Sequence, residues 1–408
     1  MLPDGATIKI DVPAMWNGTL LLYSHGYVSG PENPAEDASD VRVAAYFLDH
    51  GFALAGSSYA KTGYAVAEAL GDQMATLDTF TRRVGKPRYT IAWGQSLGGI
   101  ISAGLAQDHP DRIDGALPMC GVLAGTTAAW NGLALAEHAF VTLLAPGVRS
   151  VRIADPRANA ALASQRAADA ALTPDGRARL ALVAALDDIP AWFSGNVAPV
   201  DAPAKTDALI AWVRRSFVPF AFGYRAELET RADGNPSSTL GVSYVRAYET
   251  LTERDLIARL YRSAGLDLAA DLRALDAAPP IAADLIATMY AKRNIDFSGR
   301  LRVPVLTVHT VADGLVPVNE EAAFASVVNG AGNAALLRQL YVNRAGHCAF
   351  TAAETIAAMH AIVRRVRTGR WDDETVDALN ERASLYGNEF NASPPAFTRF
   401  VPAPMVGH

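Results

Sequence analysis

Residues 89–108 read YTIAWGQSLGGIISAGLAQD, and this stretch decides the fold. Its first part, residues 89–93, is a short apolar run of the kind that forms a strand buried on both faces. Its last part, residues 100–108, has the composition of a helix and stops near Pro110. Between them, the glycines of GQSLG permit a tight turn that exposes Ser96. The G-x-S-x-G pattern is common by chance, but a strand before it and a helix after it are the context that a nucleophilic serine needs.

Strands and helices alternate on both sides of this stretch. Further apolar or alternating runs predict strands at residues 7–12, 19–24, 52–57, 113–119, 303–310 and 336–342. Apolar positions spaced three or four residues apart predict helices at residues 41–48, 65–84, 320–328 and 351–367. The alternation predicts an α/β fold with a mostly parallel central sheet flanked by helices.

Residues 123–298 interrupt this alternation. They are rich in Ala, Arg, Asp and Leu and are largely helical in their spacing. A connection of this length usually forms a substructure of its own, so we expect a helical cap inserted before the strand at 303–310. The chain then divides into a first core segment (1–122), the cap (123–298), and a second core segment with a C-terminal tail (299–408). We expect the Pro-rich tail to run over the surface.

The composition excludes several classes of protein. Of 408 residues, 50% are hydrophobic and 19% are charged, which is an ordinary globular balance. The formal net charge of −6 does not favour binding of a polyanion, so we expect no nucleic-acid partner. The apolar runs are strand-sized, and a membrane span needs roughly 18 residues or more. Because motifs for nucleotide and metal binding are absent from the sequence, we expect no cofactor and no metal. The sequence does not indicate an oligomeric state.

Two later strand ends carry residues that complement Ser96. The predicted strand at 303–310 is followed by VADGLVP, which contains Asp313, and the strand at 336–342 by NRAGHCAF, which contains His347. With GQSLG, these motifs resemble the α/β-hydrolase superfamily, and especially its bacterial esterase and peptidase branches. The resemblance implies that Ser96 is the nucleophile, His347 the general base and Asp313 the acid that orients the histidine, in the expected chain order. Since Asp-Gly is also a common turn, a purely structural Asp313 is the alternative.

The resemblance also implies an oxyanion hole, and the sequence offers three candidates for substrate binding. An H-G pair after an early strand implies that the backbone N–H groups of Tyr27 and Leu97 hold the oxyanion. Candidates for substrate binding are Gln95, which precedes the nucleophile, and Tyr59, which follows a strand at the edge where ligands bind in such folds. A third is Trp192, in an aromatic-rich part of the cap, although such aromatic residues also simply pack a core.

These residues predict a serine hydrolase that cleaves a small-molecule carboxylic ester through an acyl-enzyme. One alternative is a serine exopeptidase or an acyltransferase that uses the same three residues. A peptidase needs a charged subsite for a peptide terminus, and the cap offers Arg214, Arg215, Glu227 and Glu229, unless these are only surface charges. A further alternative, from another class, is a binding protein on the same fold without catalysis.

The chain has two cysteines, Cys120 and Cys348. On the expected fold, Cys120 ends the strand beside that of Ser96, and Cys348 follows His347, whose loop must reach back to the serine. We therefore expect a disulfide between them, the alternative being two reduced thiols that lie near each other. A disulfide favours an oxidising compartment, so secretion or export to the periplasm is favoured over the cytoplasm. The first residues do not form a signal peptide, so we expect the leader to be missing from this sequence.

Overall fold

The computed structural model describes residues 1–371 and 375–407. Within these residues, one sheet of eight strands has the order β1-β3-β2-β4-β5-β6-β7-β8. The strands are β1 (Ile8–Asp11), β2 (Thr19–Ser24), β3 (Ala53–Ser57), β4 (Tyr89–Gln95), β5 (Gly115–Met119), β6 (Val305–Ala312), β7 (Leu337–Ala345) and β8 (Phe397–Thr398). The outer strands β1 and β8 run antiparallel to their neighbours, and the six between them are parallel. The predicted fold class is therefore confirmed.

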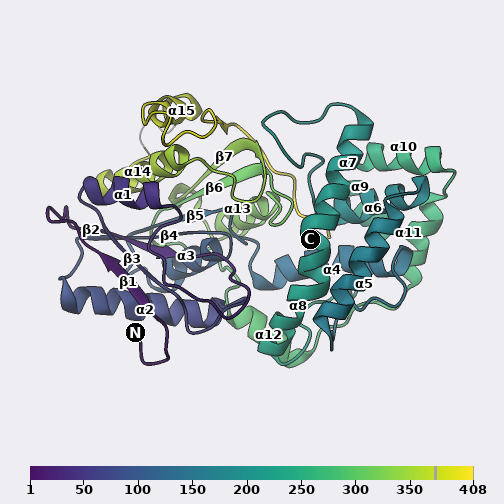
Figure 1. Ribbon diagram of the computed structural model, residues 1–408, viewed down its shortest axis with the longest axis horizontal. Coiled ribbons are helices and arrows are strands. Elements are labelled where there is room, and N and C mark those ends of the chain that lie inside the picture. Colours follow the sequence, from purple (N-terminus) through teal and green to yellow (C-terminus); the bar gives the residue numbers. More distant parts are fainter. Residues whose placement is uncertain (372–374, 408) are drawn as a thin grey trace.

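Helices cover both faces of the sheet, which explains the continuous apolar runs of its strands (Figure 1). In β2, Leu20 and Leu22 pack against the helices of one face, and Leu21 and Tyr23 against those of the other. The first face is covered by α2 (Val66–Arg83), α3 (Leu97–Asp108) and α13 (Glu320–Gly330). The second face is covered by α1 (Val41–Asp49), α14 (Ala352–Thr368) and α15 (Val376–Ser384). A short 3₁₀ turn, η3 (Ala334–Leu336), leads into β7.

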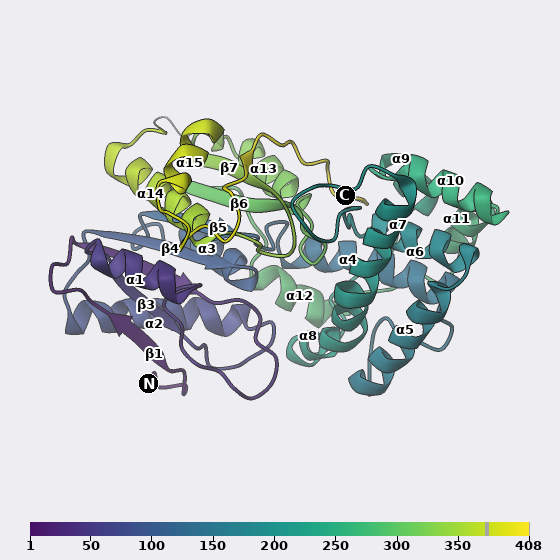
Figure 2. The same cartoon turned by 45° about the horizontal axis from the view of Figure 1, so that its top comes forward.

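The helices between β5 and β6 form a separate helical body beside the sheet (Figures 1 and 2). They are α4 (Thr126–Leu143), α5 (Pro156–Ala170), α6 (Pro174–Leu186), α7 (Ala202–Trp212), α8 (Arg225–Ala232), α9 (Tyr244–Thr250), α10 (Arg254–Ala264), α11 (Leu268–Ala277) and α12 (Leu285–Arg293). Two wide π-type turns, η1 (Val213–Phe217) and η2 (Phe220–Tyr224), join α7 to α8. We call this body the cap.

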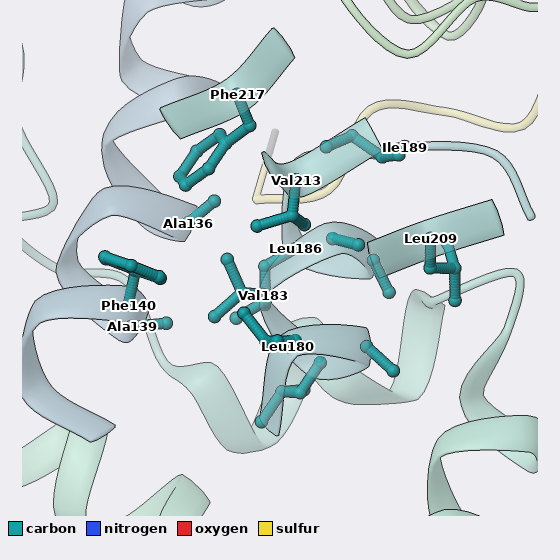
Figure 3. Packing of buried hydrophobic residues seen from close by; sticks show 14 of the residues in the cluster. Ala136, Ala139, Phe140, Leu180, Val183, Leu186, Ile189, Leu209, Val213 and Phe217 are labelled. Carbon is teal, nitrogen blue, oxygen red and sulfur yellow. The ribbon is translucent and has the colours of Figure 1, made fainter. Parts of the chain in front are cut away.

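Helix α6 lies at the centre of the cap. Its residues from Leu180 to Leu186 are all buried, and they pack against Phe140 of α4 and Leu209 of α7 (Figure 3). A helix that is apolar on every side must be enclosed by other elements. Its carboxyl end therefore lies inside the protein and not at the surface.

Most residues of the C-terminal tail after β8 are exposed or partly exposed, and the tail becomes buried only near its end. After β8 it crosses to the cap, where Val406 is buried and its backbone N–H donates to Asp188 Oδ2 over 2.9 Å. Met405 lines the same region and is partly buried, so the end of the tail places apolar surface against the cap. The tail thus connects the sheet to the cap. None of the helices within the described ranges has the length and apolar character needed to span a membrane.

Candidate active site

Ser96 lies at the turn between β4 and α3. Its backbone has φ 57° and ψ −123°, a strained conformation for a residue with a side chain. The two glycines of the motif make this turn possible. A Cβ atom would lie 2.3 Å from the carbonyl oxygen of Ser24 if placed on Gly94, and 1.8 Å from it if placed on Gly98. The motif therefore allows the turn to pack directly on the end of β2, which fixes Ser96 at the carboxyl edge of the sheet.

Ser96, His347 and Asp313 form one row of hydrogen bonds. Ser96 Oγ lies 2.8 Å from His347 Nε2, and His347 Nδ1 lies 2.7 Å from Asp313 Oδ2. The Asp313 carboxylate is fully buried, and its Oδ1 accepts from the backbone N–H groups of Leu315 and Val316. Since a carboxylate only accepts, Nδ1 of His347 carries the proton and Nε2 is free to accept one from the serine. The structure thus brings together the three residues that the motifs singled out.

A second histidine lies behind Asp313. His309 is fully buried, with Nε2 2.9 Å from the carbonyl oxygen of Val316 and 3.7 Å from Asp313 Oδ2. Its Nδ1 lies 3.4 Å from Glu321 Oε1. Burial by itself lowers the pKa of this imidazole, but Glu321 and Asp313 outweigh that effect, so the pKa of His309 is raised above its ordinary value. Both ring nitrogens face oxygen acceptors, which favours a positive charge between the two carboxylates.

The loop after β2 lies against the serine. A Cβ atom on Gly26 would lie 3.5 Å from Ser96 Cβ, so this loop approaches the nucleophile closely. The next residue, Tyr27, lines the same pocket as Ser96 and Leu97. Among the described residues, none accepts a hydrogen bond from the backbone N–H of Tyr27 or of Leu97. Both donors are thus free to bind an oxygen atom of a ligand.

A pocket lies above Ser96, between the cap and the carboxyl ends of the strands. Its walls are aromatic: Trp130 and Phe220 stack with ring centroids 5.4 Å apart, while Tyr64 and Tyr27 meet these rings edge-on. The lining also includes apolar or small residues: Val122, Ala129, Gly132, Leu133, Leu186, Leu315, Val316, Pro317 and Met405. Three carboxyl-bearing residues complete it: Asp187, Asp188 and Glu320. This described lining contains no lysine, arginine or histidine.

Comparison with known proteins gives three kinds of similarity. The model of a tannase-like family of unknown function matches residues 2–167. The chain is 29% identical to o-phthalyl amidase of Xanthobacter agilis over 423 residues, which cover 95% of this chain and 91% of the amidase. Two solved structures from Aspergillus oryzae align with 89% of this chain. One, an esterase, has 14% sequence identity and a TM-score of 0.42, and 77% of its chain is covered. The other, feruloyl esterase B, has 15% sequence identity and a TM-score of 0.41, and 78% of its chain is covered.

The order of the strands and the positions of three residues on them identify the family. The serine follows β4 at a strand-to-helix turn, the aspartate follows β6 and the histidine follows β7, on a parallel sheet flanked by helices. The chain belongs to the α/β-hydrolase superfamily. It is a hydrolase of the esterase or amidase type on this fold.

The three residues predicted to bind substrate do not line the pocket of this α/β-hydrolase. Tyr59 is buried, stacks on His25 and donates from its hydroxyl to the carbonyl oxygen of that residue. Trp192 packs against Ala312 near the base of the Asp313 loop. Gln95 is half-buried at the end of β4, outside the pocket lining. The side chains of Tyr59 and Trp192 thus contribute to packing.

The structure contains the expected disulfide between Cys120 and Cys348. Their Cα atoms are 5.4 Å apart although 228 residues separate them in sequence. Cys120 follows β5, where its backbone N–H donates to Val308 of β6, and Cys348 directly follows His347. The bond therefore joins the loop that carries the histidine to the middle of the sheet.

Loss of this disulfide should lower stability and disturb the histidine loop. We expect the Cys120→Ser/Cys348→Ser double variant to lose about 2–5 kcal/mol of unfolding free energy, because a long loop of the unfolded chain is no longer closed. Urea unfolding with and without dithiothreitol measures this loss. The wild type should be weakened by the reductant and the double variant should be insensitive to it. Equal stability of both proteins without reductant would contradict the expectation.

Buried carboxyl groups should make this hydrolase less stable as the pH rises. Burial raises the pKa of Glu137 and of Glu320 to about 8 and that of Asp188 to about 7. The folded protein therefore binds more protons than the unfolded chain between about pH 4 and pH 8. The stability that these groups contribute is complete below about pH 4 and is lost as the pH rises through 7 to 8.

We expect the free energy of unfolding to fall by a few kcal/mol between pH 5 and pH 8.5. Each carboxyl group contributes at most roughly 1.4 kcal/mol for every pH unit by which folding raises its pKa. Urea titrations across this range measure the fall. The Glu137→Gln variant should show a smaller pH dependence, because one raised carboxyl group has been removed. A stability that rises from pH 5 to pH 8.5 would show that other groups dominate.

Proposed function

We propose that this protein is a serine hydrolase that cleaves a carboxylic ester through an acyl-enzyme. The observation that carries the proposal is the row of Asp313, His347 and Ser96 at a strand-to-helix turn that opens into a pocket. In this row the carboxylate of Asp313 binds one nitrogen of His347, and the other nitrogen faces Ser96. This order assigns Ser96 as nucleophile, His347 as general base and Asp313 as orienting acid.

The reaction begins when Ser96 Oγ attacks the ester carbonyl and His347 Nε2 takes its proton. Asp313 holds the imidazole in the required tautomer and stabilises its charged form. The negative oxygen of the tetrahedral intermediate accepts from the backbone N–H groups of Tyr27 and Leu97, each worth about 2.7–4 kcal/mol of barrier. His347 then gives its proton to the departing alcohol. A water molecule, activated by the same histidine, hydrolyses the acyl-enzyme.

Cleavage of an amide is the second candidate, because the relative with 29% identity is an amidase. The same row of residues serves both reactions, provided that His347 protonates the departing amine. An exopeptidase would be a special case of this activity. Of the four charged residues of the cap that could anchor a peptide terminus, the two glutamates are already paired: Glu229 with Arg225, and Glu227 with Arg231.

A panel of matched substrates tests the proposal. We expect p-nitrophenyl esters to be hydrolysed faster than the p-nitroanilides of the same acids, and a fluorophosphonate probe to label Ser96, as located by peptide mass spectrometry. Labelling of a different serine would contradict the assigned mechanism. Faster hydrolysis of the anilides would move the protein to the amidase class.

We also propose that the protein works in an oxidising compartment, secreted or periplasmic, where the Cys120–Cys348 disulfide is stable. Alkylation of the protein in freshly opened host cells, before any reductant or air oxidation, tests this. Two alkylated thiols would contradict it.

A further inference from the structure

The carboxyl end of helix α6 delivers an acidic pair to the substrate pocket. Leu186 closes the apolar run of this enclosed helix, as Figure 3 shows, and the next two residues are Asp187 and Asp188. Both line the pocket that contains Ser96. The enclosed position of α6 therefore places two carboxyl groups in the same pocket as Ser96.

Asp187 differs from its acidic neighbours in having no partner. Asp188 accepts from Asn319 Nδ2 and from the backbone N–H of Val406, and Glu320 accepts from the backbone N–H of Ala124. No residue in the described part of the chain donates a hydrogen bond to the carboxylate of Asp187. A carboxylate without a donor in an apolar pocket is costly to the folded protein.

The charges near Asp187 are also unfavourable to its own charge. Burial, followed by the carboxyl groups of Asp188, Glu137 and Glu320, raises the pKa of Asp187 well above its ordinary value. The carboxyl end of α6 adds negative potential of the same sign. The buried Glu137, by comparison, has a guanidinium group of Arg225 at 3.1 Å. The residues lining the pocket thus offer no positive charge that would stabilise the ionised form of Asp187.

We propose that Asp187 binds a protonated amine on the acyl group of the substrate, so that the preferred substrates are esters or amides of amino-substituted acids. This inference rests on the proposed function, because Ser96 defines which part of the substrate enters the pocket. An ammonium group gives the Asp187 carboxylate both the donor and the opposite charge that it lacks. It is also favoured by the aromatic walls, since cations are attracted to the faces of such rings.

The acyl group, rather than the leaving group, is assigned to this pocket on the basis of access. A second and more open groove lies on the other side of Tyr27, lined by Gly30, Thr62, Arg157 and Glu227. The leaving group must depart after acylation, which suits the open groove, while the acyl group stays bound to Ser96 in the enclosed pocket.

Acyl substituents other than an amine fit this pocket less well. A carboxylate would bring a negative charge to this acidic pocket, and a hydroxyl group would bring no positive charge to stabilise ionised Asp187.

Three p-nitrophenyl esters of similar shape test the inference: 4-(aminomethyl)benzoate, 4-ethylbenzoate and 4-(hydroxymethyl)benzoate. For the wild type at pH 8 we expect kcat/KM for the amino ester to exceed that for the other two by at least about tenfold. In Asp187→Asn this preference should fall to about one, because the amide has the same shape and no charge. Asp175→Asn is the matched control, since Asp175 lies on the same helix but is exposed and outside the pocket. It should keep the wild-type preference.

A binding measurement separates failure of this inference from failure of the proposed function. By calorimetry, 4-(aminomethyl)benzamide should bind the Ser96→Ala protein more tightly than 4-ethylbenzamide, by at least about tenfold, and Asp187→Asn in the same background should remove the difference. If the neutral esters are cleaved at Ser96 but the amine gains nothing in turnover or binding, Asp187 is not an amine site and the hydrolase assignment stands. If no ester or amide is cleaved, the binding difference alone supports or overturns the site. A preference for the hydroxymethyl ester overturns it.

Discussion

The Ser96→Ala variant should lose about 10⁴-fold or more in kcat for ester hydrolysis while keeping its fold. The methyl group of alanine can neither attack the carbonyl nor donate the hydrogen bond that now spans 2.8 Å to His347 Nε2. The remaining activity would come from binding and from the oxyanion donors alone. Steady-state kinetics with a p-nitrophenyl ester, and circular dichroism for the fold, measure both parts of the expectation.

Ser102 provides a matched control for this substitution. It is buried in α3, the helix that follows Ser96, and its hydroxyl donates to the carbonyl oxygen of Gly99, outside the pocket lining. We expect Ser102→Ala to cost some stability but to keep most of the activity. If Ser96→Ala and Ser102→Ala had similar activity, Ser96 would not be the nucleophile.

The core of this hydrolase could be predicted because its signals are local and appear in a fixed order. A parallel strand buried on both faces is a continuous apolar run, and the residue after it lies at the carboxyl edge of the sheet. Three such strand ends carry Ser96, Asp313 and His347, so their meeting follows from the alternation of strands and helices. The boundaries differ by a few residues; β4, for example, extends through Gln95 instead of ending at residue 93.

The pocket could not be predicted in the same way, because its walls come from distant segments. Trp130 belongs to α4, Asp187 follows α6, Glu320 begins α13, and Met405 comes from the tail. Two aspartates after a helix are indistinguishable in sequence from a solvated helix end. One signal was available: residues 180–186 read LALVAAL, which is apolar on every side of a helix. The carboxyl end of such a helix lies in the interior, so the charged residues that directly follow the helix lie there too.

The end of a predicted strand places a residue at an edge of the sheet but does not give the direction of its side chain. Tyr59 follows β3 at the expected edge, yet its ring turns inward to stack on His25, with centroids 3.9 Å apart. It holds the loop that carries Tyr27 and so supports the site without reaching the substrate. The inward direction of the Tyr59 side chain depends on a positive φ of 60° at this residue, and the neighbouring sequence does not predict such an angle.

Asp313→Asn should reduce kcat by about 10⁴-fold, although the two side chains have the same shape. The reason lies in the two backbone N–H groups of Leu315 and Val316, which donate to Asp313 Oδ1 over 2.9 and 3.1 Å. An asparagine has one oxygen, and these donors hold it in that position. Its NH₂ group must then face His347 Nδ1, where it can only donate.

His347 would consequently carry its proton on Nε2 and present an N–H group to Ser96 Oγ, so it could no longer take the proton of the serine. The loss should appear in kcat at every pH from 6 to 9, because a wrong tautomer is not corrected by titration. Asp114→Asn is the control: its half-buried carboxylate accepts from the backbone N–H of Thr90 at the far end of β4, and an amide oxygen can do the same. That variant should be as active as the wild type. If Asp313→Asn retained more than about a tenth of the activity, Asp313 would be only the turn residue that its Asp-Gly sequence also suggests.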